Sequence, residues 1–287
     1  MKESKTKNKL VVGAKHRRRV IPGFGISMGV TLTMLSLVVL IPMASILISA
    51  SGLKFKEFIT TVTSREVMSS YQVSFTCAII AALINCIMGV ILAWVLVRYE
   101  FPGKRILDGL IELPFALPTA VAGIALTSLY SDKGWIGRIF AEVGIKIAYT
   151  KIGITIAMIF IGIPFVVRAI QPVLEKLDQQ YEEAARMLGA SGKRTFFKVV
   201  FPEIFPAMLT GFGLALARGI GEYGSVVFIA GNIPYETQIA PLLIMSKLEQ
   251  FNYQDATAIA LVLLVISFTL LFINNAIQIY ISKFIKT

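Results

Sequence analysis

The sequence has very few of the side chains on which enzymes and metal sites depend. Its 287 residues include one histidine, His16, and two cysteines, Cys77 and Cys86. No cluster of histidine, cysteine and carboxylate residues suggests a metal site, and no Ser-His-Asp set is available. The cysteines lie nine residues apart, on opposite faces of one helix, so we expect no disulfide between them. We expect no catalytic residue, no metal and no cofactor.

Charge is also scarce. Charged residues make up 16% of the chain, whereas soluble proteins average about 25%. Hydrophobic residues make up 56%, and the mean hydropathy is +0.75. Such a surplus is typical of a chain whose outer surface faces lipid. The composition therefore predicts an all-α, polytopic membrane protein.

Six apolar stretches predict about six transmembrane helices, since a helix needs about 20 apolar residues to cross the hydrocarbon core. The first is too long for the apolar region of a cleavable signal peptide. Arg218 and Glu222 interrupt the fifth, and the fourth is short. The stretches are 24–50, 71–97, 113–130, 152–167, 204–217 with 223–230, and 256–281.

The placement of lysine and arginine predicts the orientation, because cytoplasmic loops carry an excess of them. One topology places 19 of these residues inside and 8 outside, with both termini and the 182–202 loop in the cytoplasm. The basic tail, 1–20, is then a topogenic signal that can contact anionic lipid. Nucleic-acid binding is the alternative for this tail, and a neighbouring membrane span disfavours it.

Two glycine-rich patterns resemble phosphate-binding motifs without their context. The segment 219–224, GIGEYG, satisfies G-x-G-x-x-G, but it lies within a predicted membrane span rather than between a strand and a helix. A P-loop needs a Gly-Lys pair with a further glycine upstream, and neither Gly103–Lys104 nor Gly192–Lys193 has that glycine. The chain shows no means of binding ATP, so transport powered by ATP requires another subunit.

The charged loop 182–202, EEAARMLGASGKRTFFKVVFP, stands out in this apolar sequence. Asp178 is a suitable N-cap for a helix over 179–188, and Gly189 is a suitable C-cap. Ser191 can cap a second helix that Pro202 stops or bends. The loop therefore predicts a small helix–turn–helix outside the bilayer.

The first of these helices has one low apolar face, while its charged residues Glu182, Glu183 and Arg186 point elsewhere. Small side chains on that face would let another protein approach the backbone closely. An ordinary connecting loop that packs on its own bundle is the alternative. The face consists of Tyr181, Ala184, Ala185 and Leu188.

The spacing Glu183-Ala184-Ala185-x3-Gly189-x9-Val199-x-Phe201-Pro202 resembles the signature E-A-A-x3-G-x9-I-x-L-P of the permease subunits of ABC importers. Valine for isoleucine and phenylalanine for leucine are mild departures. In that family the loop forms coupling helices that dock in a groove of the ATPase subunit. The resemblance thus implies a coupling role for Glu183, Ala184, Ala185, Gly189 and Pro202.

Two further segments narrow the resemblance. Residues 98–126 resemble the permease core of the sulfate and molybdate group, and 221–244 is most similar to the T-type sulfate/thiosulfate permeases. The resemblance implies the type I permease fold and a permease subunit of an ATP-driven sulfate/thiosulfate importer in the inner membrane of a bacterium. Its implied partners are a W-type second permease, two ATP-binding subunits and an extracytoplasmic sulfate-binding protein. A molybdate/tungstate permease is the alternative within the group.

This resemblance implies a division of the chain into three parts. They are a cytoplasmic tail, 1–20, a first transmembrane helix with its external loop, 21–64, and a permease domain, 65–283, that contains the coupling loop, 175–203. An ion-driven secondary transporter is a rival, but Glu222 is the one embedded acid and no internal repeat is convincing. A membrane enzyme would need a cluster of catalytic polar residues, which is not visible.

Arg218 and Glu222 lie one helical turn apart in the fifth span. Ionisable groups at membrane depth usually face the bundle interior or water. The simpler interpretation is a mutual ion pair, or a contact with the partner permease. In the other, Arg218 lines the path of the anion. Five prolines, Pro114, Pro118, Pro164, Pro206 and Pro234, are expected to mark kinks or span ends.

The charge asymmetry generates a topology prediction. A single cysteine placed at Thr150 should react with an impermeant thiol reagent added outside intact cells, whereas one placed at Ser191 should not. Reaction at Ser191 in intact cells would overturn the orientation.

Overall fold

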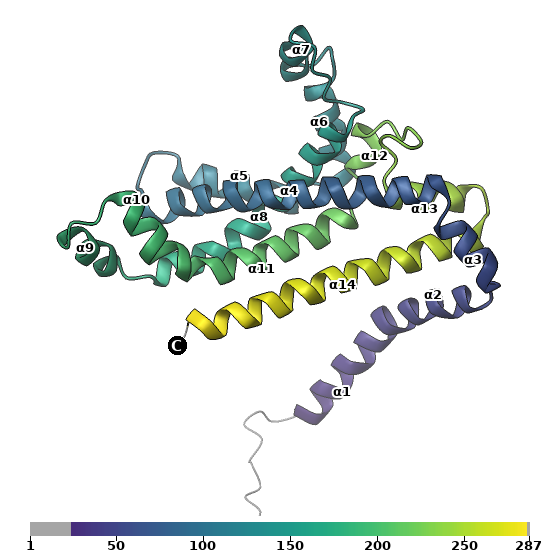
Figure 1. The fold of residues 1–287 in the computed structure, drawn as a ribbon, viewed down its shortest axis with the longest axis horizontal. Coiled ribbons are helices and arrows are strands. Elements are labelled where there is room, and N and C mark those ends of the chain that lie inside the picture. Colours follow the sequence, from purple (N-terminus) through teal and green to yellow (C-terminus); the bar gives the residue numbers. More distant parts are fainter. Residues whose placement is uncertain (1–23, 286–287) are drawn as a thin grey trace, which may run out of the picture. The chain divides into compact units, whose positions relative to one another are not determined.

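The computed structural model describes residues 24–285, and side chains through residue 281. Within those residues the chain is helical and contains no strand, which confirms the all-α prediction. The basic tail, 1–20, lies outside the described residues. Figure 1 labels α1 (Phe24–Leu35), α2 (Ile41–Ser51), α3 (Phe55–Val62), α4 (Arg65–Arg98), α5 (Lys104–Ala116), α6 (Thr119–Tyr130), α7 (Trp135–Glu142), α8 (Lys151–Lys176), α9 (Gln179–Met187), α10 (Gly192–Thr195), α11 (Phe201–Ile220), α12 (Val226–Ile229), α13 (Ala240–Glu249) and α14 (Tyr253–Ile285); the π-helical turns η1 (Ser36–Leu40) and η2 (Phe196–Val200) complete the order.

The chain divides into two compact units, residues 1–48 and 49–287. In the first, α1, η1 and the start of α2 form a continuous apolar segment, and Phe24–Ser51 is long and apolar enough to cross a membrane. None of the residues in the most apolar 18-residue stretch of this segment is buried. Its side chains are thus exposed to whatever surrounds this helix.

The core of the second unit is the packing of α8 between α4 and α11. Glycines let both neighbours come close to Val166 of α8. A Cβ added at Gly89 of α4 would lie 2.6 Å from Val166 Cγ1, and one added at Gly211 of α11 would lie 2.7 Å from Val166 Cα. Small residues allow this kind of close packing between membrane helices, where dispersion rather than water expulsion provides the attraction.

Within the part of the chain that the structure describes, five helices are long and apolar enough to span a membrane, and the count rises to six if one bent pair is a single span. That pair is α5 and α6, and the helix direction bends by 114° between them, at Leu117 and Pro118. Pro118 is the N-cap of α6, so it marks a break, as predicted. The two spans that looked weakest in the sequence belong to unbroken helices of 26 and 29 residues, Lys151–Lys176 and Gly192–Ile220.

The helix that Ser191 caps does not stop at Pro202. It continues through η2 into α11, so of the two outcomes predicted at Pro202, a stop or a bend, the stop is wrong. The turn η2 lies directly before Pro202, and at its end the Phe201 N–H donates to the Phe196 carbonyl, five residues back. This wider turn changes the carbonyl that faces Pro202, whereas in a regular α-helix the proline ring clashes with the carbonyl four residues back.

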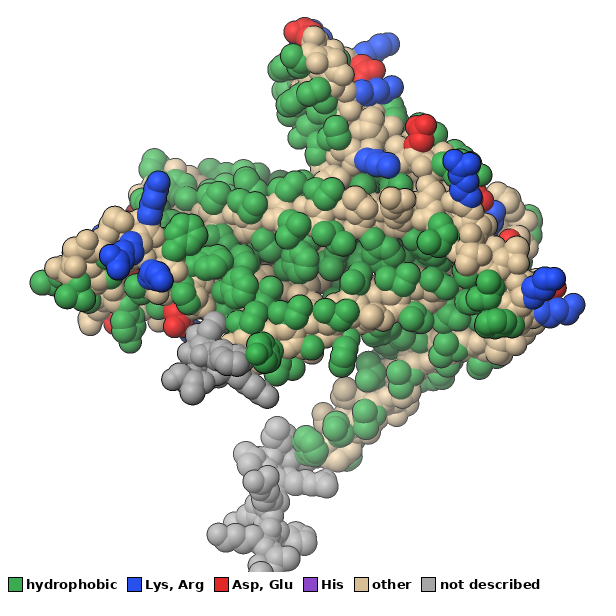
Figure 2. All heavy atoms as spheres, in the orientation of Figure 1, with side chains coloured by type: hydrophobic (Ala, Val, Ile, Leu, Met, Phe, Trp, Pro, Cys, Tyr) green, Lys and Arg blue, Asp and Glu red, His purple; other side chains and the backbone are tan. Residues whose placement is uncertain are grey.

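Hydrophobic side chains cover the middle of the long helices on the face seen in Figure 2. Lys and Arg side chains gather at the α9–α10 end, near α3 and on the projecting α7. Exposed hydrophobic residues on α4 and α14 include Ile87, Ile91, Val265 and Phe272. An apolar band between charged ends is the surface that a lipid bilayer requires.

Candidate functional site

The loop 178–202 is built by three local capping interactions that the sequence predicted. The Oδ1 of Asp178 accepts a hydrogen bond from the Gln180 N–H at 3.0 Å and starts α9. Gly189 follows α9 with a φ of +81°. The Ser191 Oγ accepts a hydrogen bond from the Arg194 N–H at 3.4 Å and starts α10.

The end of α9 is a Schellman motif. The Gly189 N–H donates to the Arg186 carbonyl at 2.9 Å, and the Ala190 N–H donates to the Ala185 carbonyl at 3.0 Å. This arrangement needs a left-handed residue at the position of Gly189, which glycine adopts without steric cost. A Cβ at Gly189 would meet nothing within 4 Å, so backbone conformation, not space, selects glycine here.

One side of α9 is bare. Tyr181 is 63% exposed, Leu188 89%, and Ala184 is also exposed. Met187, which is 90% exposed, adds apolar area that the sequence analysis missed. Large apolar side chains in such exposed positions mark surfaces that bind another protein or a membrane.

Glu182, which was predicted to point away from the apolar face of α9, is buried. It is 6% exposed, and its Oε1 lies 2.7 Å from the Arg98 Nη2 at the end of α4. Glu183, by contrast, is exposed. Only the three-dimensional packing brings Glu182 to Arg98, so no local pattern in the sequence could have revealed the contact.

A second ion-pair cluster joins α5 to α8. Arg168 Nη1 lies 2.8 Å from Asp108 Oδ1, and Arg168 Nη2 lies 2.7 Å from Glu112 Oε1. Arg168 also donates to the Gln171 Oε1 at 2.5 Å. Asp108 Oδ1 has no hydrogen-bond partner, so its contact with Arg168 is an ion pair.

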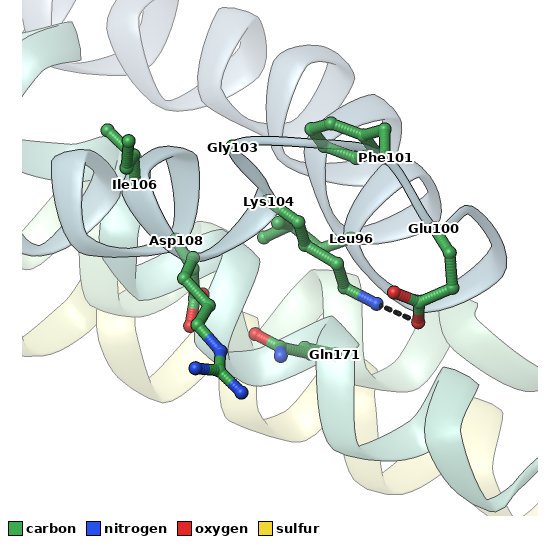
Figure 3. Close-up of a pocket in the computed structure, with 9 residues that line it drawn as sticks. Leu96, Glu100, Phe101, Gly103, Lys104, Ile106, Asp108 and Gln171 are labelled. Atoms are coloured by element: carbon green, nitrogen blue, oxygen red, sulfur yellow. Dashed lines mark hydrogen bonds and ion pairs between the residues drawn. The ribbon is translucent and has the colours of Figure 1, made fainter.

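Beside this cluster is an open cavity of about 530 Å³ at the turn between α4 and α5 (Figure 3). Lys104 and Glu100 form an ion pair there at 2.7 Å, with Glu100 88% exposed. The mixture of signs gives this cavity no preference for an anion. Its lining consists of Leu96, Glu100, Phe101, Gly103, Lys104, Arg105, Ile106, Asp108 and Gln171.

Arg218 and Glu222 form an ion pair, with Arg218 Nη1 and Glu222 Oε2 separated by 2.5 Å. The Glu222 side chain is 2% exposed, and that of Arg218 is 35% exposed. The other carboxylate oxygen, Glu222 Oε1, accepts hydrogen bonds from the Ser225 N–H at 2.8 Å and from the Ser225 Oγ at 2.9 Å. The carboxylate therefore closes the turn between α11 and α12.

This turn supports the base of α6. The backbone of Ser225 would lie within 3.0 Å of a Cβ added at Gly123, and Gly224 packs equally closely on Thr119. The GIGEYG segment is thus the end of α11 and the turn after it, preceded by a helix. It is not a dinucleotide-binding loop.

Comparison with known proteins assigns the class. Residues 85–287 match the family model for the inner membrane component of binding-protein-dependent transport systems. The match covers more than half of the chain, and the structure is that of an ABC importer permease of type I. The chain belongs to this family of multi-pass, inner-membrane transport subunits.

Individual relatives of the chain carry names that also state a transported substrate. The chain is 52% identical to a probable sulfate transport system permease protein of Chlorokybus atmophyticus, over 86% of this chain and 87% of the relative. It is 46% identical to the sulfate transport system permease protein of Salmonella typhimurium, over 91% and 94% of the two chains. The corresponding protein of Escherichia coli is 45% identical over the same shares.

Solved structures share the fold at low sequence identity. A chain of a bacterial alginate ABC transporter in complex with its alginate-bound periplasmic protein has a TM-score of 0.75 at 16% identity, over 91% of this chain and 95% of that one. A chain of the MetNI methionine ABC transporter has a TM-score of 0.57 at 14% identity, over 75% and 96%. The expected type I permease fold is confirmed.

The ion pair at the end of α11 generates a stability prediction. The substitution Glu222→Ala leaves the buried Ser225 N–H without its acceptor and Arg218 without its partner, which should cost about 1–3 kcal/mol of unfolding free energy. Cys77 and Cys86 are free and buried, so a thiol-reactive dye reports unfolding of the purified permease. The melting temperature should fall for Glu222→Ala. It should not change for Glu249→Ala, which removes an exposed carboxylate at the end of α13. Equal melting temperatures for the two variants would contradict the role of Glu222.

Proposed function

We propose that this chain is the permease subunit of an ATP-driven importer of sulfate and thiosulfate. The observation that carries the coupling part of the proposal is the bare face of α9. Asp178 caps the start of this helix, and Gly189 ends it. The sulfate transport names of relatives at 45–52% identity support the substrate. They favour sulfate over molybdate or tungstate, the alternative oxyanions.

The proposed mechanism is alternating access. ATP binding would close a pair of ATPase subunits and carry the docked α9 with it, and the spans would then rock to open the pathway outward. Glu183, Ala184, Ala185, Gly189 and Pro202 would form or shape the docking loop. The permease itself would hydrolyse no ATP, bind no cofactor and carry no catalytic residue.

The assembly would contain a second, W-type permease, two ATP-binding subunits and an extracytoplasmic sulfate-binding protein. Both termini of this chain would lie in the cytoplasm. The three parts of the chain would be the tail, 1–20, the first helix with its external loop, 21–64, and the permease domain, 65–283. The tail would lie against anionic lipid, not nucleic acid.

Arg218 and Glu222 would lie at the pathway or at the interface with the second permease. Their ion pair supports a structural role, because Glu222 compensates the charge of Arg218. The remaining exposure of Arg218 still gives an anion access to one side of the guanidinium. An ion-driven secondary transporter has less support, since Glu222 is fixed by Ser225 and Arg218 rather than free to carry protons.

The loop generates a coupling prediction. A leucine in the left-handed conformation of residue 189 should raise the free energy of the loop by about 1 kcal/mol or more. Gly189→Leu should therefore tilt the bare face of α9 away from the groove of the ATPase subunit. Gly192→Leu adds the same bulk at an ordinary backbone conformation with open space, so it is the matched control. Pull-down of the ATPase subunit and sulfate uptake should both fall for Gly189→Leu and be retained for Gly192→Leu.

Glu183→Ala should leave the fold intact and weaken docking by roughly 1–3 kcal/mol if the contact is desolvated. The same pull-down and uptake assays measure it. Gly189→Leu and Glu183→Ala should both insert into the membrane normally, because neither substitution changes a span. If Gly189→Leu and Glu183→Ala both bind the ATPase and transport at the wild-type rate, this loop is only a connector.

The substrate has its own test. In a strain lacking its sulfate importers, cells that express the complete assembly should accumulate radiolabelled sulfate. Excess thiosulfate should compete for uptake, whereas excess molybdate should not. Uptake of radiolabelled molybdate that excess unlabelled sulfate does not reduce would assign the chain to the alternative.

A further inference from the structure

Arg98 occupies a position where three segments of the chain meet. It is the last residue of α4, and its side chain is 9% exposed. Its Nη2 lies 2.7 Å from Glu182 Oε1 of α9 and donates a hydrogen bond to the Leu177 carbonyl at 3.2 Å. Leu177 is the C-cap of α8. One guanidinium thus joins the ends of α4 and α8 to the middle of α9.

The last turn of α4 also contacts the other arm of the loop. The Arg98 guanidinium lies 5.8 Å from the centre of the Trp94 ring. Trp94 in turn packs edge-on against Phe196 of η2, with ring centroids 5.4 Å apart. The two sides of the cytoplasmic loop, α9 and the start of the α10–α11 helix, are therefore both held by one turn of α4.

Burial makes the Arg98–Glu182 contact different from the other ion pairs of this region. Both side chains are more than nine-tenths buried, whereas Lys104 and Glu100, at the same separation of 2.7 Å, are 27% and 88% exposed. An exposed pair contributes little, because water solvates the separated charges. Opening a buried pair leaves two poorly solvated charges, so α9 resists moving away from α4.

The contact also retains unused hydrogen-bonding capacity. Arg98 Nε and Glu182 Oε1 are buried without a hydrogen-bond partner, so the pair is held by charge at short range and not by a two-pronged hydrogen bond. Arg186 Nη2, at 4.0 Å from Glu182 Oε2, is too distant to compensate for Arg98. Glu182 thus depends on Arg98.

We propose that Arg98 and Glu182 form a latch that makes α9 move as one body with α4 and α8. The inference rests on the proposed docking of α9 on an ATPase. Docking uses the exposed face of α9, whereas the latch holds the buried face. With the latch closed, a displacement of α9 would be passed to the α4–α8 pair at the centre of the bundle. With the latch removed, α9 would follow the ATPase while the spans stayed behind.

The latch therefore predicts uncoupling and not dissociation. The test uses the complete transporter, reconstituted in proteoliposomes with its binding protein, and measures ATPase association, ATP hydrolysis and sulfate transported per ATP. Glu182→Gln keeps the shape of the side chain and removes its charge, and Arg98→Ala removes the partner. Each should retain the ATPase subunit but lower the sulfate transported per ATP by about tenfold, within the range of usual coupling energies. Hydrolysis should also lose its dependence on the binding protein.

The control and the rescue separate a latch from a general structural role. Glu100→Gln breaks the exposed ion pair shown in Figure 3 and should leave all three measurements unchanged. The double variant Arg98→Glu with Glu182→Arg restores opposite charges, although it loses the hydrogen bond to Leu177. It should transport more sulfate per ATP than either single exchange, Arg98→Glu or Glu182→Arg.

Several results would overturn the latch. Wild-type coupling in Glu182→Gln would do so, as would loss of ATPase association in proportion to transport, because Glu182 would then belong to the docking surface. If Glu182→Gln does not accumulate in the membrane, the double variant Arg98→Glu with Glu182→Arg decides. If this double variant accumulates and transports more sulfate per ATP than the single exchanges, the latch is supported. If it accumulates but transports no more sulfate per ATP than they do, the latch is refuted. A wild-type assembly that transports no sulfate would reject the proposed substrate instead, and the latch would then be judged on whether hydrolysis in the variants still depends on the binding protein.

Discussion

The exclusion of water from the bilayer is the constraint on which this structure depends. A chain in hydrocarbon must satisfy its backbone groups internally, so the spans are helices, and most of their charged residues lie toward the helix ends. Arg98 with Glu182 lies at the end that bears the loop, and Arg218 with Glu222 closes α11 at its other end. Arg168 lies farther inside α8 and is compensated by Asp108. Packing between the spans is left to small residues such as Gly89 and Gly211.

The loop 178–202 combines rigidity with exposure. Its caps at Asp178, Gly189 and Ser191 satisfy backbone groups at the ends of α9 and at the start of α10 locally. Its outer face can then remain bare, with Leu188 almost fully exposed. Rigidity from local hydrogen bonds and attachment through Glu182 leave the opposite face available for a partner.

The parts of the fold that short-range chemistry determines could be predicted from the sequence. The apolar stretches, the caps of α9 and α10, and the left-handed Gly189 all depend on residues within a few positions of one another. The burial of Glu182 could not be predicted, because Arg98 is far away in the sequence. Whether the helix stops or continues at Pro202 could not be decided from the proline alone, because the π-helical turn before it is not visible in the sequence. The break before α6 was predicted from Pro118, whereas the contact of Gly123 with Ser225 could not be predicted, because the two residues are far apart in the sequence.

The continuous helix from Gly192 to Ile220 gives these separate features one mechanical connection. It begins at the cap that follows Gly189 and ends beside the Glu222 carboxylate, whose partner Ser225 packs on the base of α6. A helix that had stopped at Pro202 would have placed a flexible joint between the loop and the membrane. Because the helix is unbroken, and because Trp94 packs on Phe196 at its start, movement of the α10 side of the loop has a continuous helix along which to pass into the bundle. In the proposed importer, that movement would reach the turn at Glu222 through α11 and the centre of the bundle through α4 and α8.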